Sequence, residues 1–446
     1  MRARIAVCLV LASFALGLAR ESRAQFGGEA RAPVVVTPDS QRSYRVAIQR
    51  FADLSPVDRS TRSVKFADAL ADALEFSSVF ARIDEQAFLG PEVTTSLDGD
   101  PAVVCSDWTQ IGTDALVQGE IAVVEGRFGV AVRVWDVVRC KDVIRRRYSQ
   151  AAEKNPAIIA RRVADDIVEA FVGVRGVSST EIAFVSDRGG NKEIFVMNAD
   201  GSEARAATSN RSINNFPGWS ADGSAIVYTS YRHDDRPLLF LSSRGGRRPG
   251  RLLNGDERAQ YRGVFDPAGR DLAIVLSTGS APDLFLVNDD GRNLRRITRT
   301  RSIEVSPAWS PDGKRLAFVS DKTGSPHVYV MNRDGSAVRR LTYDGSYNTS
   351  PAWSPDGRWI AYETRVGGQF DIWLIDPDGG VSVPLVTHPR SDEGPSWSPD
   401  SRKLIFSSTR RGRADLYAMD IDGSNLRRLT SGAGNNTSPA WGPYPK

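Results

Sequence analysis

Apolar and polar positions in the C-terminal half of the chain repeat with a nearly fixed period. The phrase aromatic-x-x-(Asp/Ala)-(Gly/Ser) occurs five times, and the first interval is 46 residues while the next three are 44 residues each. The phrase begins at Trp219, Phe265, Trp309, Trp353 and Trp397, and a further aromatic, Trp441, follows at the same 44-residue spacing near the end of the sequence. A period of this length predicts a radial array of small sheets rather than a globule with one core.

Each repeat contains four short strands and no helical periodicity. In the repeat that begins at Trp309, the first strand leads into the aromatic, and the others are predicted over 316–319, 328–331 and 338–342. Ser-Pro-Asp-Gly and Asp-Gly sequences supply tight turns between these strands. A four-stranded sheet cannot bury both faces alone, so the sheets are expected to stack around an axis with the repeated aromatic wedged between neighbours.

The number of sheets follows from the two ends of the repeat region. The first period, 182–208, has three strands but no aromatic-bearing first strand, whereas the segment 437–441 is a first strand with nothing after it. Joined together, these fragments make one complete blade. The sequence therefore predicts an all-β six-bladed propeller over 178–446, closed by pairing of its N-terminal and C-terminal strands.

The preceding region, 41–173, alternates between strand and helix patterns. Phe66, Leu70 and Leu74 share one stripe of a predicted helix, and 127–136 with 141–150 alternate as a hairpin. A second helix is expected to begin at Asn155-Pro156 and to end at Gly173. These patterns predict an α/β N-terminal domain.

The first 24 residues resemble a cleaved export signal. A basic start precedes a short apolar stretch, and small residues lie before a cut after Ala24. Removing residues 1–24 takes away four arginines and one glutamate, so the formal charge falls from +4 to +1. This balance gives no argument for nucleic-acid binding, and no later segment is apolar enough to span a membrane. Residues 25–40 are expected to form a mobile arm.

Two cysteines remain after signal cleavage, Cys105 and Cys140. In an oxidising compartment they can form a disulfide. The alternative is a pair of buried thiols that do not meet. The sequence leaves both possibilities open.

The residues give little sign of catalysis, and we expect no catalytic, cofactor or metal site. The chain lacks the G-x-S-x-G motif of propeller-capped serine hydrolases. His233, His327 and His388 are not spaced as metal ligands and are interpreted as loop or surface residues. The repeated Asp-Gly pairs are better explained as turns than as calcium loops.

One polar position recurs five residues before each aromatic. It is expected at the start of the innermost strand, where that strand opens on one mouth of the propeller. The residues are Asn214, Gln260, Glu304, Asn348, Asp392 and Asn436, which we call the polar ring. Either the ring forms a docking surface for a protein or peptide, or its side chains cap local turns.

Together, these motifs resemble the TolB family of the Tol-Pal system of Gram-negative bacteria. The resemblance covers the export signal, the small α/β domain and units of the form W-S-P-D-G…I-A-F…I-Y-V-M-N-x-D-G-S…R-R-L-T. The chain departs from this pattern at Phe265-Asp-Pro-Ala-Gly269 and in a degenerate second unit.

The resemblance implies a non-enzymatic periplasmic protein that binds the outer-membrane lipoprotein Pal at a propeller mouth. It also implies that the mature N-terminal arm engages TolA or folds back and alters affinity for Pal, in support of outer-membrane integrity and of invagination during cell division. The arm would include Gln25, Phe26, Val34, Val35 and Val36. The Pal surface would include the polar ring with Arg262 and Glu393.

The competing interpretation is an exported propeller hydrolase or a glycan-binding protein. It predicts a channel lined by converging carboxylates or aromatic side chains.

Overall fold

The computed structural model describes residues 43–55, 61–89, 97, 103–246, 250–279 and 281–445. The expected export signal, residues 1–24, and the expected arm, residues 25–40, lie outside the described residues. Within the described ranges, no helix is both long and apolar enough to cross a membrane.

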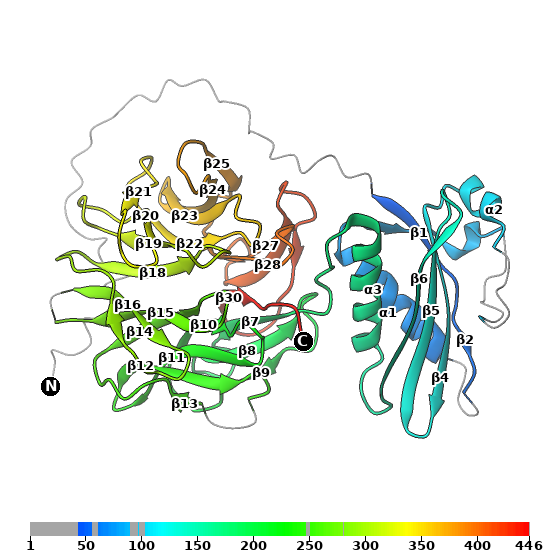
Figure 1. Ribbon diagram of the computed structural model, residues 1–446, viewed down its shortest axis with the longest axis horizontal. Coiled ribbons are helices and arrows are strands. Elements are labelled where there is room, and N and C mark those ends of the chain that lie inside the picture. Colours follow the sequence, from blue (N-terminus) through cyan, green and yellow to red (C-terminus); the bar gives the residue numbers. More distant parts are fainter. Residues whose placement is uncertain are drawn as a thin grey trace. The chain divides into compact units, whose positions relative to one another are not determined.

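The first structured region is a sheet with two long helices on one face (Figure 1). The strand order is β3-β1-β4-β5-β6, and β2 also pairs with β4. Strand β1 runs parallel to β3 and β4, whereas β4, β5 and β6 are antiparallel. The elements are β1 Tyr44–Ile48, β2 Ala52–Asp53, α1 Arg62–Phe76, β3 Phe80–Arg82, the 3-10 turn Glu85–Ala87, α2 Cys105–Gln110, β4 Ala115–Val124, β5 Arg127–Asp136, β6 Lys141–Ala151 and α3 Ala157–Val172.

The helices form where the apolar spacing predicts them. Phe66, Leu70 and Leu74 project from α1 into the core and are fully buried. The Asn155 carboxamide oxygen accepts the amide hydrogen of Ala157 at 3.0 Å, which caps the start of α3. Helix α3 ends at Gly173, whose φ of 74° is the left-handed conformation that favours glycine.

The two cysteines form a disulfide, which settles the alternatives that the sequence leaves open. Cys105 lies on α2 and Cys140 in the turn between β5 and β6, with their Cα atoms 5.7 Å apart. The bond therefore fixes the short helix against the hairpin.

From Glu181 onward the chain forms six four-stranded sheets, which are the blades of a propeller (Figure 1). In each sheet the strands run in order from the innermost to the outermost. The first blade contains β30 Asn436–Trp441, β7 Glu181–Ser186, β8 Glu193–Asn198 and β9 Arg205–Ala206. The second contains β10 Asn214–Trp219, β11 Ala225–His233, β12 Arg236–Ser243 and β13 Arg251–Leu252, and the third β14 Gln260–Phe265, β15 Asp271–Ser277, β16 Pro282–Asn288 and β17 Arg295–Arg296. The fourth contains β18 Glu304–Trp309, β19 Arg315–Ser320, β20 His327–Asn332 and β21 Arg339–Arg340. The fifth contains β22 Asn348–Trp353, β23 Ile360–Val366, β24 Gln369–Ile375 and β25 Ser382–Val386, and the sixth β26 Asp392–Trp397, β27 Lys403–Ser408, β28 Asp415–Asp420 and β29 Arg427–Arg428.

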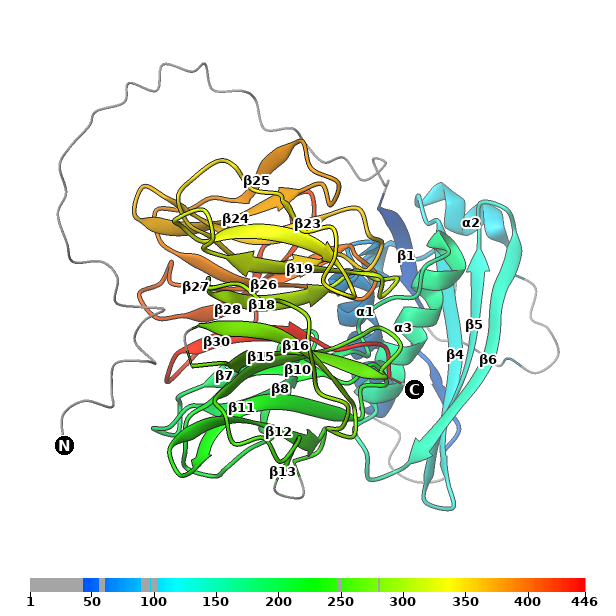
Figure 2. The ribbon, with the colours of Figure 1, turned by 60° about the vertical axis from the view of Figure 1, so that its left-hand side comes forward.

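The propeller closes by the strand pairing that the sequence predicts. Strand β30 pairs antiparallel with β7, so that Trp441 lies opposite Ile182 and Asn436 opposite Ser186. Figure 2 shows β30, in red, beside the green strands of the first blade. The six-bladed architecture is confirmed.

The repeated aromatic residues pack between neighbouring blades, and several also donate a hydrogen bond. The indole nitrogen of Trp309 donates to the carbonyl of Val264 at 3.1 Å, and that of Trp397 to the carbonyl of Ala352 at 2.9 Å. Each acceptor belongs to the innermost strand of the preceding blade. The indole thus buries its ring and satisfies its one polar group at the interface between two blades.

Most of the fourth strands are shorter than the sequence predicts. The Arg-Arg pairs form ladders of only two residues, as in β17, β21 and β29. The threonine two residues after each pair forms a hydrogen bond with the third strand through its side chain. In the fourth blade, the Thr342 hydroxyl accepts the amide hydrogen of Val328 at 2.9 Å. Thr298 and Thr430 do the same in their blades. A side chain therefore replaces backbone pairing at the outer edge.

The segment between α3 and β7 is held by a buried carboxylate. Asp165, fully buried, accepts the amide hydrogens of Ser178 and Ser179 at 2.7 and 2.9 Å. Burial raises the pKa of Asp165 to about 6, against the opposing effect of these hydrogen bonds.

Candidate partner-binding site

The polar ring occupies the first position of each innermost strand. All six side chains are buried, with exposed fractions of 1% or less. The members are Asn214 on β10, Gln260 on β14, Glu304 on β18, Asn348 on β22, Asp392 on β26 and Asn436 on β30. The structure thus brings the six residues to equivalent places, but it leaves none of their side chains on the surface.

Two members of the ring, themselves buried, bind arginine side chains from nearby loops. The Asp392 carboxylate accepts a hydrogen bond from Arg410 at 3.0 Å, and the Asn436 carboxamide oxygen accepts one from Arg188 at 3.0 Å. Each arginine belongs to the loop that follows the second strand of the same blade. These pairs fix the loops around one end of the propeller.

The other four members bind the loops of their own or the preceding blade. The Asn214 amide donates to the Lys192 carbonyl at 3.1 Å, and the Gln260 amide to the Asp256 carbonyl at 2.7 Å. Glu304 accepts from Thr300 and Ser320, and its pKa is raised by burial. The geometry favours the interpretation that these side chains cap local turns.

Asn348 contacts His327, a histidine whose position was predicted incorrectly from the sequence. Its amide nitrogen lies 3.0 Å from Nδ1 of His327, and His327 is buried rather than on a loop or surface. The interpretation of His327 as a surface residue is therefore wrong, because β20 begins at this residue and carries it into the blade. Burial, with the neighbouring Arg340, lowers the pKa of His327.

A second ring lies two residues further along the same strands, and the sequence analysis misses it. Here the backbone is left-handed in every blade, with φ between 36° and 66°, and the pairing register shifts at the same place in each strand. We call it the bulge ring: Phe216, Arg262, Ser306, Ser350, Gly394 and Ser438.

The only signal in the sequence was a proline after five of these six residues. The residue before proline normally adopts an extended conformation, so local preferences argue against a left-handed one. The repeated bulge is instead imposed by the sheet, where it re-aims side chains at the strand that lines the axis.

Charges gather beside the bulge ring from three blades. Arg262 lies on the third blade, Glu363 on β23 of the fifth and Glu393 on β26 of the sixth. Glu363 accepts the amide hydrogen of Gly394 at 2.5 Å, and burial together with the charge of Glu393 raises its pKa to about 7. The guanidinium of Arg262 acts in the opposite direction.

The three charged groups differ in exposure. Burial lowers the pKa of Arg262, against the opposing effect of Glu363. Glu393 reaches solvent, although partial desolvation by the surrounding strands and the charge of Asp392 raise its pKa. The third and fifth blades are not neighbours, so the electrostatic interaction of Arg262 with Glu363 places both charges toward the axis. Glu363 is a candidate site residue that the repeat pattern does not single out.

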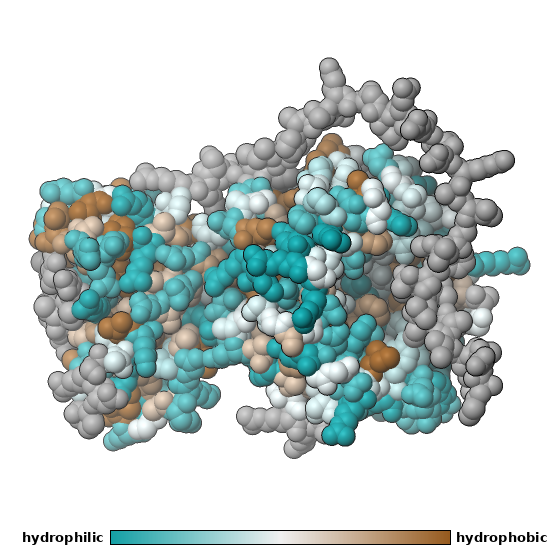
Figure 3. Space-filling view, turned by 180° about the vertical axis from the view of Figure 1, so that it is seen from behind, coloured by the Kyte–Doolittle hydropathy of each residue, from teal (hydrophilic) through white to brown (hydrophobic). Residues whose placement is uncertain are grey.

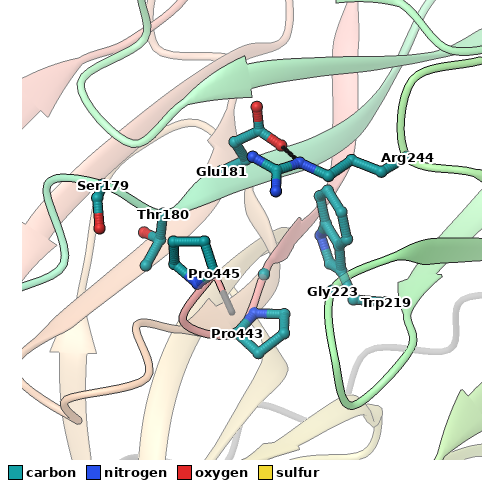
Figure 4. A pocket seen from close by; sticks show the side chains of 9 residues that line it. Ser179, Thr180, Glu181, Trp219, Gly223, Arg244, Pro443 and Pro445 are labelled. Atoms are coloured by element: carbon teal, nitrogen blue, oxygen red, sulfur yellow. Dashed lines mark hydrogen bonds and ion pairs between the residues drawn. The ribbon is translucent and has the colours of Figure 1, made fainter. Parts of the chain in front are cut away.

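The structure offers little space for a small ligand at the closing strand. A depression there has a volume of about 10 Å³, enough for one water molecule. Glu181 projects toward Arg244 across it and pairs with that residue, as Figure 4 shows. In the described ranges, no three His, Cys, Asp or Glu side chains are grouped as they would be to hold a metal ion.

On the face shown in Figure 3, hydrophilic side chains predominate and apolar ones occur in small groups. This face offers no broad apolar groove among the residues that are described.

Comparison with known proteins gives the family. The profile of the TolB beta propeller domain matches residues 168–445, and that of the TolB amino-terminal domain matches residues 32–143. A Tol-Pal system protein TolB from Desulfosudis oleivorans is 35% identical over 257 residues, which is 57% of each chain. Another from Anaeromyxobacter dehalogenans is 34% identical over 284 residues, 63% of this chain and 62% of the relative. The chain thus aligns with less than two thirds of the length of these two relatives.

A solved structure extends the likeness of fold to both regions. The crystal structure of TolB from Acinetobacter baumannii has a TM-score of 0.72 and 24% identity, and covers 93% of this chain and 98% of its own. At this identity, the match supports the fold alone. Because the propeller profile alone covers more than half of the sequence, the chain belongs to the TolB family of Tol-Pal system proteins.

Proposed function

We propose that this chain is a non-enzymatic periplasmic component of the Tol-Pal system that binds the outer-membrane lipoprotein Pal through its propeller. The observation that carries the proposal is membership of a family whose named relatives are Tol-Pal system proteins. In this role the chain acts by binding proteins, and it contributes to outer-membrane integrity and to invagination of that membrane during cell division.

The geometry supports a docking role for one end of the propeller, in which the polar ring has a structural role and the charges beside the bulge ring make contact with the partner. The polar ring holds the surrounding loops in place through buried hydrogen bonds. Next to the polar ring, Arg262 carries its charge toward the axis, and Glu393 reaches solvent. We propose that Pal contacts Arg262, Glu393 and the loops. The buried polar ring supports this surface by holding the loops in place; its members are Asn214, Gln260, Glu304, Asn348, Asp392 and Asn436.

We further propose that residues 25–39 form the link to TolA and modulate the affinity for Pal. Within this arm, Phe26 and the run Val34-Val35-Val36 supply the apolar and β-prone side chains that an extended segment uses when it joins a partner, and Gln25 adds a polar amide at its start.

The test is capture of Pal from solubilised outer membranes by the mature chain, which begins at Gln25, and by the same chain without residues 25–39. We expect both forms to retain Pal, with different affinities, and only the longer form to retain TolA. A matched control replaces Glu393 by alanine, which leaves the arm intact and weakens only Pal capture. If neither form retains Pal, the proposal is wrong, and an exported hydrolase or glycan-binding protein becomes the better interpretation.

A further inference from the structure

A histidine at the start of the third strand distinguishes the fourth blade from the third and the sixth. In the third blade, Asp283 accepts a hydrogen bond from Arg296 at 2.5 Å. In the sixth blade, Asp415 accepts one from Arg428 at 2.6 Å. Each arginine is the second member of an Arg-Arg pair on the outermost strand. In these two blades a carboxylate therefore neutralises that arginine.

In the fourth blade the corresponding arginine binds an imidazole instead. Arg340 donates to Nε2 of His327 at 2.8 Å, since a guanidinium has no acceptor. The arginine is otherwise placed in the same way, because its Nε donates to the Thr342 carbonyl at 2.6 Å, as that of Arg296 does to the Thr298 carbonyl at 2.8 Å. Burial and the neighbouring charge of Arg340 lower the pKa of His327, so the imidazole is neutral at pH 7. The charge of Arg340 is left in place.

Arg340 has no carboxylate partner among the described residues. Its further contacts in those ranges are the Thr323 hydroxyl, at 3.4 Å, and the ring of Tyr343, whose centroid lies 4.9 Å from the guanidinium carbon. Tyr343 is 71% exposed. Asp344, the next residue, is exposed and forms no ion pair with Arg340. A guanidinium without a counter-charge therefore lies beside an aromatic ring on the surface.

The Arg340–Tyr343 pair lies at the same end of the propeller as the polar ring. Residues 343–347 join β21 to β22, and the polar-ring member Asn348, which begins β22, donates to the Asp344 carbonyl at 2.9 Å. A standard protein interface covers about 800 Å² of each partner. A protein that docks over the axis at this end therefore extends across the loops of the rim.

We propose that Arg340 and Tyr343 form a second contact for the partner that docks at this end, and that they bind a glutamate or aspartate side chain of that partner. A guanidinium and a carboxylate form strong, charge-assisted hydrogen bonds, and the exposed ring covers them from one side. Tyrosine and arginine are also the residue types that most often supply binding energy at protein interfaces. The inference rests on the proposed function, because the partner is Pal, and it adds a contact on the rim to those near the axis.

The test neutralises Arg340 without removing it. His327→Asp gives the fourth blade the acid that the third and sixth blades have. In the sixth blade the polar-ring residue Asn436 donates to Asp415 at 3.4 Å, and Asn348 is placed to do the same for the new carboxylate. The variant should therefore fold, and it should lose the free positive charge of the rim.

Isothermal titration with the soluble domain of Pal compares the mature wild-type chain with H327D, Y343A and R339A. R339A is the matched control, because Arg339 precedes Arg340 but donates to the carbonyls of Pro377 and Asp378, both at 2.8 Å. We expect binding at least about fivefold weaker in H327D and in Y343A, and unchanged within about twofold in R339A. Raising the salt concentration to about 0.5 M should reduce the loss in H327D and preserve the loss in Y343A, because salt screens the charge and not the ring.

The outcomes separate this inference from the proposed function. Wild-type affinity in both H327D and Y343A would overturn the inference and leave Pal binding intact, whereas the absence of Pal binding by the wild type would overturn both. A loss in R339A as large as that in H327D would also overturn the inference, because the effect would then not depend on the position of the charge. Thermal unfolding shows whether H327D is folded. If it is not, Y343A decides, since the fold does not depend on this exposed side chain.

Discussion

The polar ring and the bulge ring lie two residues apart on the same six strands, yet one has similar side chains in all six blades and the other has the same backbone conformation with different side chains. The polar ring keeps its chemistry: every member is polar, buried and bonded to nearby loops. The bulge ring keeps its backbone: every member is left-handed, while the side chain changes from glycine to arginine. Repeated chemistry at a buried position supports the fold, whereas a constant backbone with varied side chains can give one mouth its specificity.

The largest effect should come from the polar ring. In Asp392→Ala the Arg410 guanidinium, whose side chain is 13% exposed, loses the fully buried carboxylate that holds it, and removing one partner of a largely buried pair should cost up to about 3–5 kcal/mol of unfolding free energy. Ser438→Ala, in the bulge ring, should cost less than about 1 kcal/mol, since it leaves the backbone conformation accessible. Urea denaturation measures both. Equal losses of unfolding free energy in the two variants would contradict the difference in structural role between the polar ring and the bulge ring.

The next effect is a pH dependence that originates beside the bulge ring. Because the pKa of Glu363 is raised to about 7, the folded chain keeps this proton between about pH 4.5 and 7 while the unfolded chain loses it. Stability from this group is therefore present at low pH and falls, by on the order of 3 kcal/mol at most, as the pH rises to 7. Denaturation of Glu363→Gln at several pH values should show a flatter profile than the wild type. An identical profile would show that Glu363 is not perturbed in this way.

A smaller effect should identify backbone strain at the bulge ring. Valine in place of Ser306, whose φ is 54°, introduces a β-branched side chain into a left-handed conformation and should cost about 1–3 kcal/mol. Glycine at the same position should be neutral or slightly stabilising. Thermal unfolding compares the two. If Ser306→Gly is as damaging as Ser306→Val, the serine side chain matters more than the backbone.

The smallest effect on stability should come from Glu393→Ala. The side chain reaches solvent, so its removal should change the unfolding free energy by less than about 0.5 kcal/mol. Calorimetric titration with Pal should nevertheless show weaker binding. A stable variant with undiminished affinity would remove Glu393 from the proposed surface.

The sequence predicts the fold well because period and turn chemistry are local signals. The spacing of Trp309, Trp353 and Trp397, and the complementary ends at 182–208 and 437–441, are sufficient to count the blades and close the propeller. The fourth strands were predicted too long, because the hydroxyl of residues such as Thr342 replaces ladder bonds that sequence pattern cannot distinguish from strand.

The site was less predictable, for a physical reason. Whether Asp392 faces solvent or Arg410 depends on a loop 18 residues away, and no local preference encodes that choice. The left-handed conformation of Ser350, before a proline, runs against local preference and is imposed by the sheet. Glu363 falls outside the repeated phrase, so only the folded propeller brings it to Gly394.

The central claim is that Arg262 of the bulge ring and the adjacent Glu393, and not the buried polar ring, meet the partner. Isothermal titration of the soluble domain of Pal into the mature chain and into R262A/E393A tests it most directly, with circular dichroism to confirm that the variant is folded. The account predicts one Pal per wild-type chain and affinity at least about tenfold weaker in the variant, equivalent to 1.4 kcal/mol. Equal affinity for both chains, or no binding by the wild type, would contradict it.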